Sequence, residues 1–465
     1  MTRALRTTAA ALALAIAAAP PAAAQHPLVA LPLSDPAYTQ LDGLLARGCD
    51  AARVSPFRPF MVKDVRRALR EARGERTCAG PMLDRLAQRF LADSAAGDSL
   101  AALTRVTLGA SLTVQGTALH GGEFAPLWRD VRATSAGTPP AVGLASLRLT
   151  WTGGPNLVAV SEAYGETSRR NDPTVRAGIF RNSQAVIDVN DAYVAGKLGP
   201  VVLSVGRARE AWLGEGDESL VLSAHGPPLD RVALTAQWSR FELRALLASL
   251  NDVVLTPAQD TIADSLGAQR WHRMLAAHAL TYRPSRRVEL TIGETALIPH
   301  QGSGFQLAYA NPVLIYQMAQ QDSARETRPE GNVNLTAFGG ARATIGRATV
   351  QGELLIDDIQ IDAKDRRRFP DQLAWNLRAT YPLPLPLSPI LEGQYRRIGS
   401  FTYLESFYTD SWQQYNQPIG SELGPDADLA RLGAQLWPSG RLRLGVGVSR
   451  WRHGAHRIDQ RPTPN

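Results

Sequence analysis

Residues 145–151 read ASLRLTW, a strict alternation of apolar and polar side chains. Because successive side chains of a β-strand point to opposite faces, this stretch predicts a strand with one apolar and one polar face. The same period of two recurs in residues 105–115, 288–293, 372–381, 430–436 and 441–449. The longest runs match the length of about 9–11 residues with which a tilted strand crosses a bilayer.

The polar faces of these strands carry Arg, Thr, Gln and Gly, which is typical of a barrel with lipid outside and water inside. Lipid offers no partner to unpaired backbone groups, so such strands must close into a barrel. Short turns at 152–156, 198–200 and 437–440 alternate with long polar segments at 117–140, 165–184 and 252–270. Aromatic residues lie at or near strand ends, as interface girdles require: Trp151, Trp375, Tyr381, Trp437 and Trp451.

We therefore predict an all-β transmembrane barrel over residues 99–465. A spacing of roughly 20 residues per strand and connection gives about 18 antiparallel strands. A large soluble β-sandwich or propeller, which also alternates, is the alternative interpretation.

The composition of the 465 residues narrows the class of protein. No stretch after residue 24 approaches 18 consecutive apolar residues, which excludes a helical transmembrane protein. Only three of the 50 basic residues are lysine (63, 197 and 364), so we attribute the formal charge of +7 to an arginine bias of base composition. No basic stripe with interleaved aromatic residues is present, and we expect no nucleic-acid partner.

Residues 1–24 have the pattern of a secretory signal peptide. Arg3 and Arg6 precede an apolar run at 9–19, and Ala22 to Ala24 form a small-residue cleavage site before Gln25. An alanine-rich core helix is the alternative. No cysteine stands at the cleavage site, so we do not expect a lipid anchor. This pattern predicts export and a mature chain beginning near Gln25.

Residues 25–98 form a small helical subdomain in this interpretation. Three short helices are predicted from apolar residues at helical spacing: Leu41, Leu44 and Leu45; Val62, Val65 and Leu69; Leu83, Leu86 and Phe90. We expect this bundle to pack against or plug the barrel. Export permits a disulfide between Cys49 and Cys78, the only cysteines; two buried free thiols are the alternative.

Candidate catalytic chemistry is sparse. Glu353 and Asp357 share one strand face at about 13 Å, too far apart for the paired carboxylates of a glycosidase. Asp358 faces the other side unless a bulge intervenes. We interpret these carboxylates as lumen-lining or loop-anchoring groups paired with arginine. His272 and His278 are too distant for shared metal ligation and are interpreted as lumen residues. We expect no catalytic residue, no metal and no cofactor.

Several segments together resemble the Wzi-type capsule-assembly family of outer-membrane proteins. The first comprises Gly206, Arg207, Trp212, Gly214, Gly216 and Ser223. The resemblance continues at residues 273–278, at Glu294, Asn311 and Pro312, at Glu353, Asp357 and Asp358, and at Gly424, Asp426 and Asp428. It covers most of the mature chain. It implies a barrel of about 18 strands with a small helical part at its periplasmic end, and an outer surface that helps retain or assemble capsular polysaccharide.

The expected function is therefore a non-catalytic barrel of the bacterial outer membrane. It would act as a monomer and bind, or help assemble and retain, capsular or extracellular polysaccharide at the cell surface. A porin-like, anion-preferring channel with an arginine-rich lumen is the alternative, and an exported carbohydrate-active enzyme is a distant third.

One feature departs from the family pattern. Residues 459–465 are polar, contain two prolines and cannot form a closing strand. Either the barrel closes through residues 441–451 with a trailing tail, or the sequence is cut short.

Overall fold

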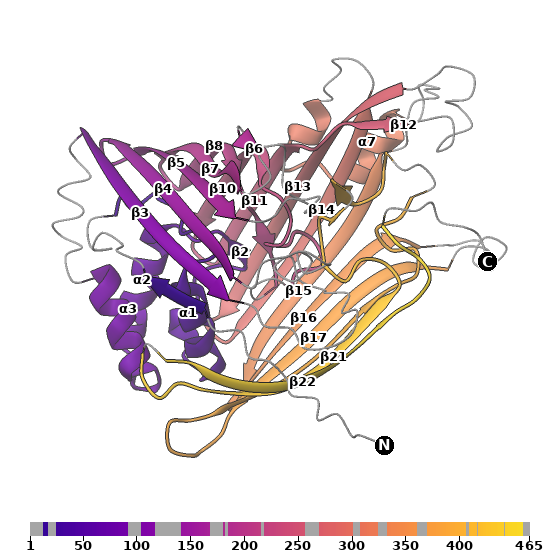
Figure 1. Cartoon of the computed structure of the whole chain (residues 1–465). Helices are drawn as coiled ribbons and strands as arrows, with labels where there is room; N and C mark the ends of the chain where they lie inside the picture. The colour runs from indigo at the N-terminus through magenta and orange to yellow at the C-terminus, as the bar shows by residue number, and fades with distance from the viewer. Residues whose placement is uncertain are drawn as a thin grey trace, which may run out of the picture.

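Antiparallel strands with alternating burial make up the wall of the molecule (Figure 1). The structure is a computed structural model. It describes residues 25–91, 104–116, 141–167, 180–181, 185–214, 218–255, 269–300, 307–323, 333–359, 370–405, 409–415, 417–440 and 442–458, together with a strand at Ala13–Ile16.

The sheet holds 18 strands within the described residues; 17 of them lie in residues 99–465, where about 18 were predicted. Fifteen are long: β3 (Thr104–Gly116), β4 (Ala141–Gly153), β5 (Leu157–Thr167), β7 (Ala185–Leu198), β8 (Val201–Ala208), β10 (Leu229–Trp238), β11 (Phe241–Ser249), β13 (Gln269–Ser285), β14 (Val288–His300), β15 (Asn334–Ile345), β16 (Ala348–Asp358), β17 (Gln372–Pro382), β18 (Ile390–Ile398), β21 (Ala427–Leu436) and β22 (Leu444–His453). Three are short: β1 (Ala13–Ile16), β6 (Phe180–Arg181) and β12 (Val253–Leu255).

The long strands pair in chain order from β3 to β22, each antiparallel to the next. β1, which lies within the predicted signal peptide, pairs with β3. β22 is the last described strand and overlaps the closing strand expected in residues 441–451. The polar tail at 459–465 lies outside the described residues.

The outward face of the wall is apolar. Leu290 and Ile292 of β14 are 45% and 68% exposed, whereas Glu289 before them and Thr291 between them are buried. Leaving a Leu or Ile side chain in water instead of burying it costs about 1.5–3 kcal/mol, and many strands repeat this pattern. The outward face therefore suits lipid, as predicted, and the alternative of a soluble sandwich or propeller is wrong.

The connections at the two ends of the barrel differ in length. Short turns join β4 to β5, β7 to β8, β10 to β11, β13 to β14, and β15 to β16 at what we call the turn end. Long segments lie at the opposite end, which we call the loop end; among them are residues 209–228 between β8 and β10, and residues 399–426 between β18 and β21.

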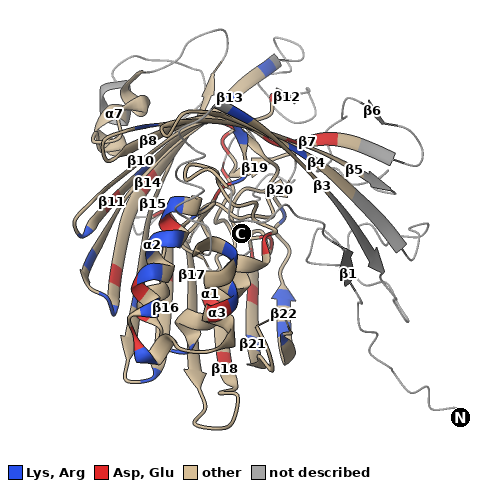
Figure 2. Cartoon of the chain, turned by 90° about the vertical axis from the view of Figure 1, so that its left-hand side faces the viewer, with Lys and Arg blue, Asp and Glu red and all other residues tan. Residues whose placement is uncertain are grey.

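Three helices lie at the turn end (Figure 2). They are α1 (Pro36–Ala46), α2 (Val62–Arg73) and α3 (Pro81–Leu91), with the short elements η2 (Asp50–Ala52), β2 (Phe57–Arg58) and η3 (Arg76–Cys78) between them. The Asp35 side chain caps α1 by accepting from the Ala37 N–H at 2.8 Å, and Pro36 begins the helix. The three predicted helices are thus present.

The helical segment is fastened to the turns of the barrel. The Gln40 side chain donates to the Gly440 carbonyl at 2.8 Å, and His26 hydrogen-bonds the Gly154 carbonyl at 2.9 Å. Its apolar residues share one core with wall residues such as Val158, Tyr193 and Val202. The segment therefore occupies the turn end of the barrel.

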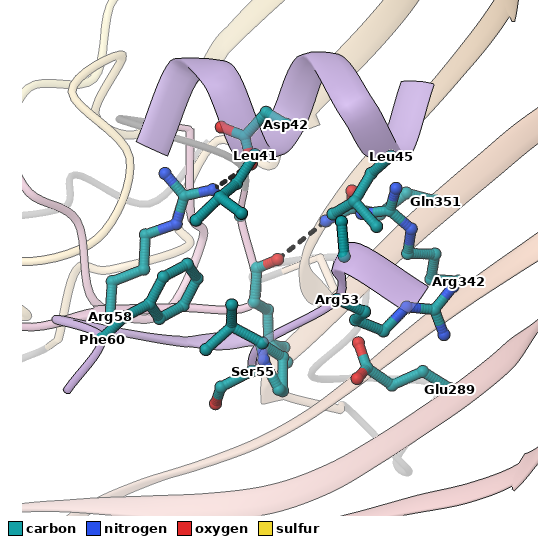
Figure 3. A pocket seen from close by; sticks show the side chains of 15 residues that line it. Leu41, Asp42, Leu45, Arg53, Ser55, Arg58, Phe60, Glu289, Arg342 and Gln351 are labelled. Atoms are coloured by element: carbon teal, nitrogen blue, oxygen red, sulfur yellow. Dashed lines mark hydrogen bonds and ion pairs between the residues drawn. The ribbon is translucent and has the colours of Figure 1, made fainter. Parts of the chain in front are cut away.

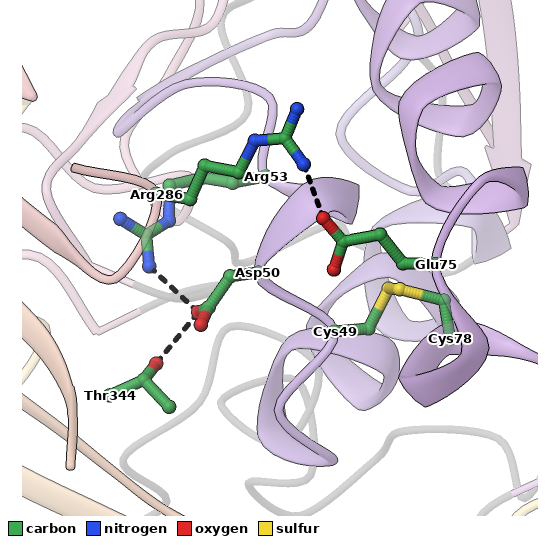
Figure 4. The surroundings of a disulfide bond; sticks show 7 residues. All are labelled: Cys49, Asp50, Arg53, Glu75, Cys78, Arg286 and Thr344. Carbon is green, nitrogen blue, oxygen red and sulfur yellow. Dashed lines mark hydrogen bonds and ion pairs between the residues drawn. A yellow bond between two sulfur atoms is a disulfide. The ribbon is translucent and has the colours of Figure 1, made fainter. Parts of the chain in front are cut away.

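A disulfide joins Cys49 and Cys78 at the ends of η2 and η3 (Figure 4). The two cysteines are therefore bonded, and the alternative of two free thiols is wrong. Next to it, Asp50 pairs with Arg53 at 3.2 Å and accepts from Thr344 Oγ1 at 2.7 Å. Thr344 belongs to β15, so the bridged part of the helical segment also contacts the wall.

Candidate functional site at the loop end

Residues 209–228 fold from the loop end into the barrel. Trp212 of β9 (Ala211–Trp212) is fully buried, and its ring meets Phe57 and Phe338 edge-on at 5.1 and 6.1 Å. β9 pairs with β2, so this loop meets the helical segment inside the lumen. A Cβ at Gly214 would overlap the backbone of Ser219, which explains the glycine there. Gly216 lies outside the described residues.

Residues 399–426 fold inward against the first loop. The Tyr403 hydroxyl donates to the Leu220 carbonyl at 2.6 Å, and the Trp412 indole N–H donates to the Val221 carbonyl at 3.0 Å. The Ser223 N–H donates to the carbonyl of Ile419 at 2.9 Å. We call the described parts of residues 209–228 and 399–426 the plug loops, because they pack as one unit inside the barrel.

Two carboxylates of β16 anchor the plug loops to the wall. Glu353 accepts from the Leu220 N–H at 3.0 Å, and Asp357 accepts from the Tyr403 N–H at 2.7 Å. Each is buried and holds a different loop, which fits the predicted anchoring role, but the contacts shown are with backbone N–H groups and not with the predicted arginines. The register of β16 against β17 shifts between Ile356 and Asp358. This irregularity is the bulge on which the predicted direction of the Asp358 side chain depended.

Two buried arginines complete the anchoring; Arg273 begins the segment 273–278 that carries the resemblance, whereas Arg396 was not singled out from the sequence. Arg273 donates to the Gln413 carbonyl at 3.0 Å and to the Asn251 side chain at 2.7 Å. Arg396 donates to the Ser421 hydroxyl at 2.9 Å and pairs with Glu422 at 3.4 Å. Arg396 shares a strand face with Glu392 and Gln394, and this polar face was the signal that could have found it.

A buried ion cluster ties the first plug loop to the wall. Glu210, whose side chain is fully buried, pairs with Arg231 of β10 and Arg244 of β11, each at 2.7 Å. Further along the same loop, burial raises the pKa of Glu218, while Arg378 and Arg396 oppose that rise. Together with the anchors above, these contacts show that plug loops and helical segment occupy the lumen.

A small cavity of about 30 Å³ lies where the helical segment meets the wall (Figure 3). Arg53, Glu289, Arg342 and Gln351 line it together with Leu213 of the first plug loop. Burial lowers the pKa of Arg53, and the neighbouring Glu289 opposes that change. Within the described residues, no group of three or more His, Cys, Asp or Glu side chains could hold a metal ion.

The remaining motif residues do not gather at one site. Arg207 pairs with Asp230 at 2.7 Å, and Gly206 has a φ of 127°, which favours glycine. Glu294 points to the outer side of the wall, and Asn311 and Pro312 belong to a segment on that side. Gly424 and Asp426 close the second plug loop, where the Asp426 N–H donates to the Gly399 carbonyl at 2.9 Å. Asp428 pairs with Arg452 at 2.8 Å.

The expectation that His272 and His278 line the lumen is wrong. Both share the parity of Leu280 and Tyr282 on β13, which are 37% exposed on the outward face. His272 pairs with Asp252 at 2.9 Å, and the ring of His278 packs on Tyr316 with centroids 4.5 Å apart. Polarity misassigned His278 because a chain segment covers it on the outer wall, whereas His272 lies near the loop end with a side chain 45% exposed.

Asp410 should make the packing of the plug loops pH-dependent. Its burial raises the pKa to about 7, above the ordinary value of 3.8. The folded loop therefore binds the proton more tightly than the unfolded chain, and stability should fall as pH rises from about 4 through about 7. Hydrogen exchange of the plug-loop amides, corrected for intrinsic rates, should show weaker protection at pH 8 than at pH 5. The D410N variant should lose this difference; an unchanged pH dependence would assign it to another group.

The apolar outer face, the antiparallel barrel and the filled lumen define a class of protein: a transmembrane β-barrel of the bacterial outer membrane. Among solved structures, this chain is similar to Wzi of Escherichia coli, an outer-membrane protein involved in group 1 capsule assembly and described as a carbohydrate-binding β-barrel. The match has a TM-score of 0.56 and 14% identity, and covers 92% of this chain and 86% of Wzi. The resemblance noted from the sequence is thus confirmed for the fold.

Two porins also match, with lower structural agreement. OccD3 of Pseudomonas aeruginosa has a TM-score of 0.36 and 13% identity over 66% of each chain. A mutant of the Rh. blastica porin has a TM-score of 0.35 and 11% identity, and covers 74% of this chain and 94% of the porin. No protein-family model and no curated protein sequence matches the chain. No helix in the described part is long and apolar enough to span a membrane.

Proposed function

We propose that this protein is a non-catalytic outer-membrane barrel that binds extracellular or capsular polysaccharide and helps retain it at the cell surface. The observation that carries the proposal is the filled lumen. Because the plug loops and the helical segment occupy it, the loop end offers a binding surface in place of a pore. The fold shared with Wzi, itself described as carbohydrate-binding, supports the same conclusion.

The chemistry of the loop end suits an acidic polysaccharide. Arg270 and His272 lie on β13 where that strand reaches the loop end, with side chains 67% and 45% exposed; both pair with Asp252, at 3.4 and 2.9 Å, so a sugar carboxylate would compete with or join that carboxylate. The ring of His300 lies 5.5 Å from that of His272. A guanidinium binds a sugar carboxylate through charge-assisted hydrogen bonds. Sugar rings can pack on the flat faces of the two imidazoles.

Replacing Arg270 should weaken binding of a carboxylate-bearing polysaccharide. Loss of one exposed, charge-assisted contact is expected to lower the affinity roughly 2- to 10-fold. Calorimetry on the barrel in lipid nanodiscs would measure the affinity of R270A. The matched control is R286A: Arg286 follows the other end of β13 at the turn end, with a side chain 61% exposed. Equal losses in both variants would contradict recognition at the loop end.

The porin-like alternative makes a distinct prediction for planar bilayers. A plugged barrel should show no steady ion conductance, whereas a channel would conduct and select anions. Deletion in the native host tests the biological role, because loss of the protein should release polysaccharide from the cell surface to the medium. Unchanged surface polysaccharide, with none released, would overturn the proposed function.

A further inference from the structure

The segment after β14 folds back over the outside of the barrel. Even-numbered residues of β13 and β14 face outward, as the exposed Leu280, Leu290 and Ile292 show. Nearer the loop end, Ala276, Ala296 and Ile298 have the same parity but are buried. The residues that cover them are Tyr309 of η4 (Leu307–Ala310) and Tyr316 and Ala319 of α7 (Tyr316–Ser323).

α7 thus packs on the lipid side of the wall, and Figure 2 shows it outside the strands that surround α1, α2 and α3. We call residues 307–319 the outer flap. Its two structured parts are held together by the Tyr316 hydroxyl, which donates to the Tyr309 carbonyl at 3.1 Å.

A carboxylate of the outer wall holds the outer flap in place. Glu294 accepts from the Tyr316 N–H at 2.8 Å, and the Tyr316 ring packs edge-on against His278, the residue opposite Glu294 on β13. A carboxylate facing hydrocarbon without a partner would be costly. The flap lowers that cost by covering Glu294 and supplying a backbone donor.

Three further aromatic residues near the turn end, which we take as part of the aromatic girdle, allow the depth of Glu294 and the flap in the membrane to be estimated. Trp238, Phe241 and Tyr282 stack near the turn end with ring centroids 6.0 and 4.9 Å apart. His278 lies four residues beyond Tyr282, about 13 Å along the strand or roughly 10 Å above the girdle for a usual strand tilt. The apolar band of such barrels is about 25 Å tall, so Glu294 and the flap above it lie within it.

The exposed side of the outer flap is apolar. Leu307, Val313, Ile315 and Met318 are 77%, 81%, 48% and 58% exposed. Residues 307–319 read LAYANPVLIYQMA and contain no charged side chain. An uncharged surface of this kind continues the lipid-facing wall formed by Ile292 and Leu280 and is unfavourable in water.

We propose that the outer flap is a lipid-docking surface, with its exposed apolar side chains inserted among the acyl chains of the outer leaflet. We infer lipid as the partner for two reasons. The flap continues the lipid-facing wall, and Glu294, which the flap covers, lies within the apolar band. The barrel would thereby be widened on one side by a membrane-embedded segment that belongs to a connection at the loop end.

Spin labels on single introduced cysteines test this proposal in the whole protein. Both native cysteines are in the disulfide, so V313C and M318C each provide one free thiol. In phosphatidylcholine vesicles, labels at both positions should collide with oxygen and be shielded from a water-soluble nickel chelate, as expected for the lipid-facing control I292C. Leu387, 53% exposed in a turn, provides the aqueous control L387C. Nickel accessibility equal to that of L387C would overturn the proposal.

The Glu294 anchor gives a second, independent readout. In E294A the M318C label should gain mobility, because the flap loses its hydrogen-bond acceptor. In E294Q the side-chain carbonyl still accepts from the Tyr316 N–H, and the mobility should stay close to that of the parent. Equal mobility of the M318C label in E294A and in the parent would show that Glu294 does not hold the flap.

Discussion

Replacing Glu353 and Asp357 together by alanine should open the barrel to ions. Each carboxylate binds the backbone N–H of one plug loop, Leu220 in the first and Tyr403 in the second. Leaving a buried donor without a partner costs about 1–3 kcal/mol, so the pair of substitutions should release both loops from β16. Planar-bilayer recordings should show steady conductance from the double variant and none from the parent.

The control for this experiment is E392A. Glu392 is a carboxylate of β18 that pairs with Arg378 of the neighbouring strand at 2.9 Å, so its loss should leave the barrel closed. Heat-shifted mobility on gels verifies that each variant is a folded barrel. A folded double variant that does not conduct would show that these carboxylates do not keep the plug loops in place.

Glu210→Gln should produce the largest loss of stability of any single change considered. The substitution leaves Arg231 and Arg244 buried without a negative partner, and breaking a buried ion pair costs about 3–5 kcal/mol. Denaturant unfolding of the barrel in lipid vesicles, followed by tryptophan fluorescence, would measure the difference in free energy of unfolding.

Asp230→Asn is the matched control for that measurement. Asp230 also pairs with an arginine at 2.7 Å, but its side chain is 47% exposed, and exposed pairs contribute about 1 kcal/mol or less. If both variants lose the same free energy, burial of the Glu210 cluster is not what stabilises the plug.

Part of the candidate site could be predicted from the sequence. Glu353 and Asp357 were interpreted as loop anchors because they share a strand face at a spacing that excludes paired catalysis. Their partners could not be predicted, since they are backbone N–H groups 133 and 46 residues away, and every residue except proline carries such a group. The same holds for Arg273, which binds loop carbonyls.

The error at His278 has a physical cause. A period of two shows which residues share a face, but only polarity indicates which face meets water. His278 and Glu294 are polar residues on the lipid side, and they are tolerated there because Tyr316 covers them. The sequences of β13 and β14 do not show that the outer flap, a separate segment, covers part of their outer face.

The sequence by itself determined the strands, their apolar faces and the three helices, because each depends on contacts within a few residues and on the solvent that one face meets. It contains the two cysteines but does not show whether they are bonded. Only the tertiary structure decided that the lumen is filled and that residues 307–319 lie outside the wall. The filled lumen depends on hydrogen bonds between segments far apart in the chain, and the place of residues 307–319 depends on a hydrogen bond to a residue 22 positions earlier. Both use backbone groups that all sequences share.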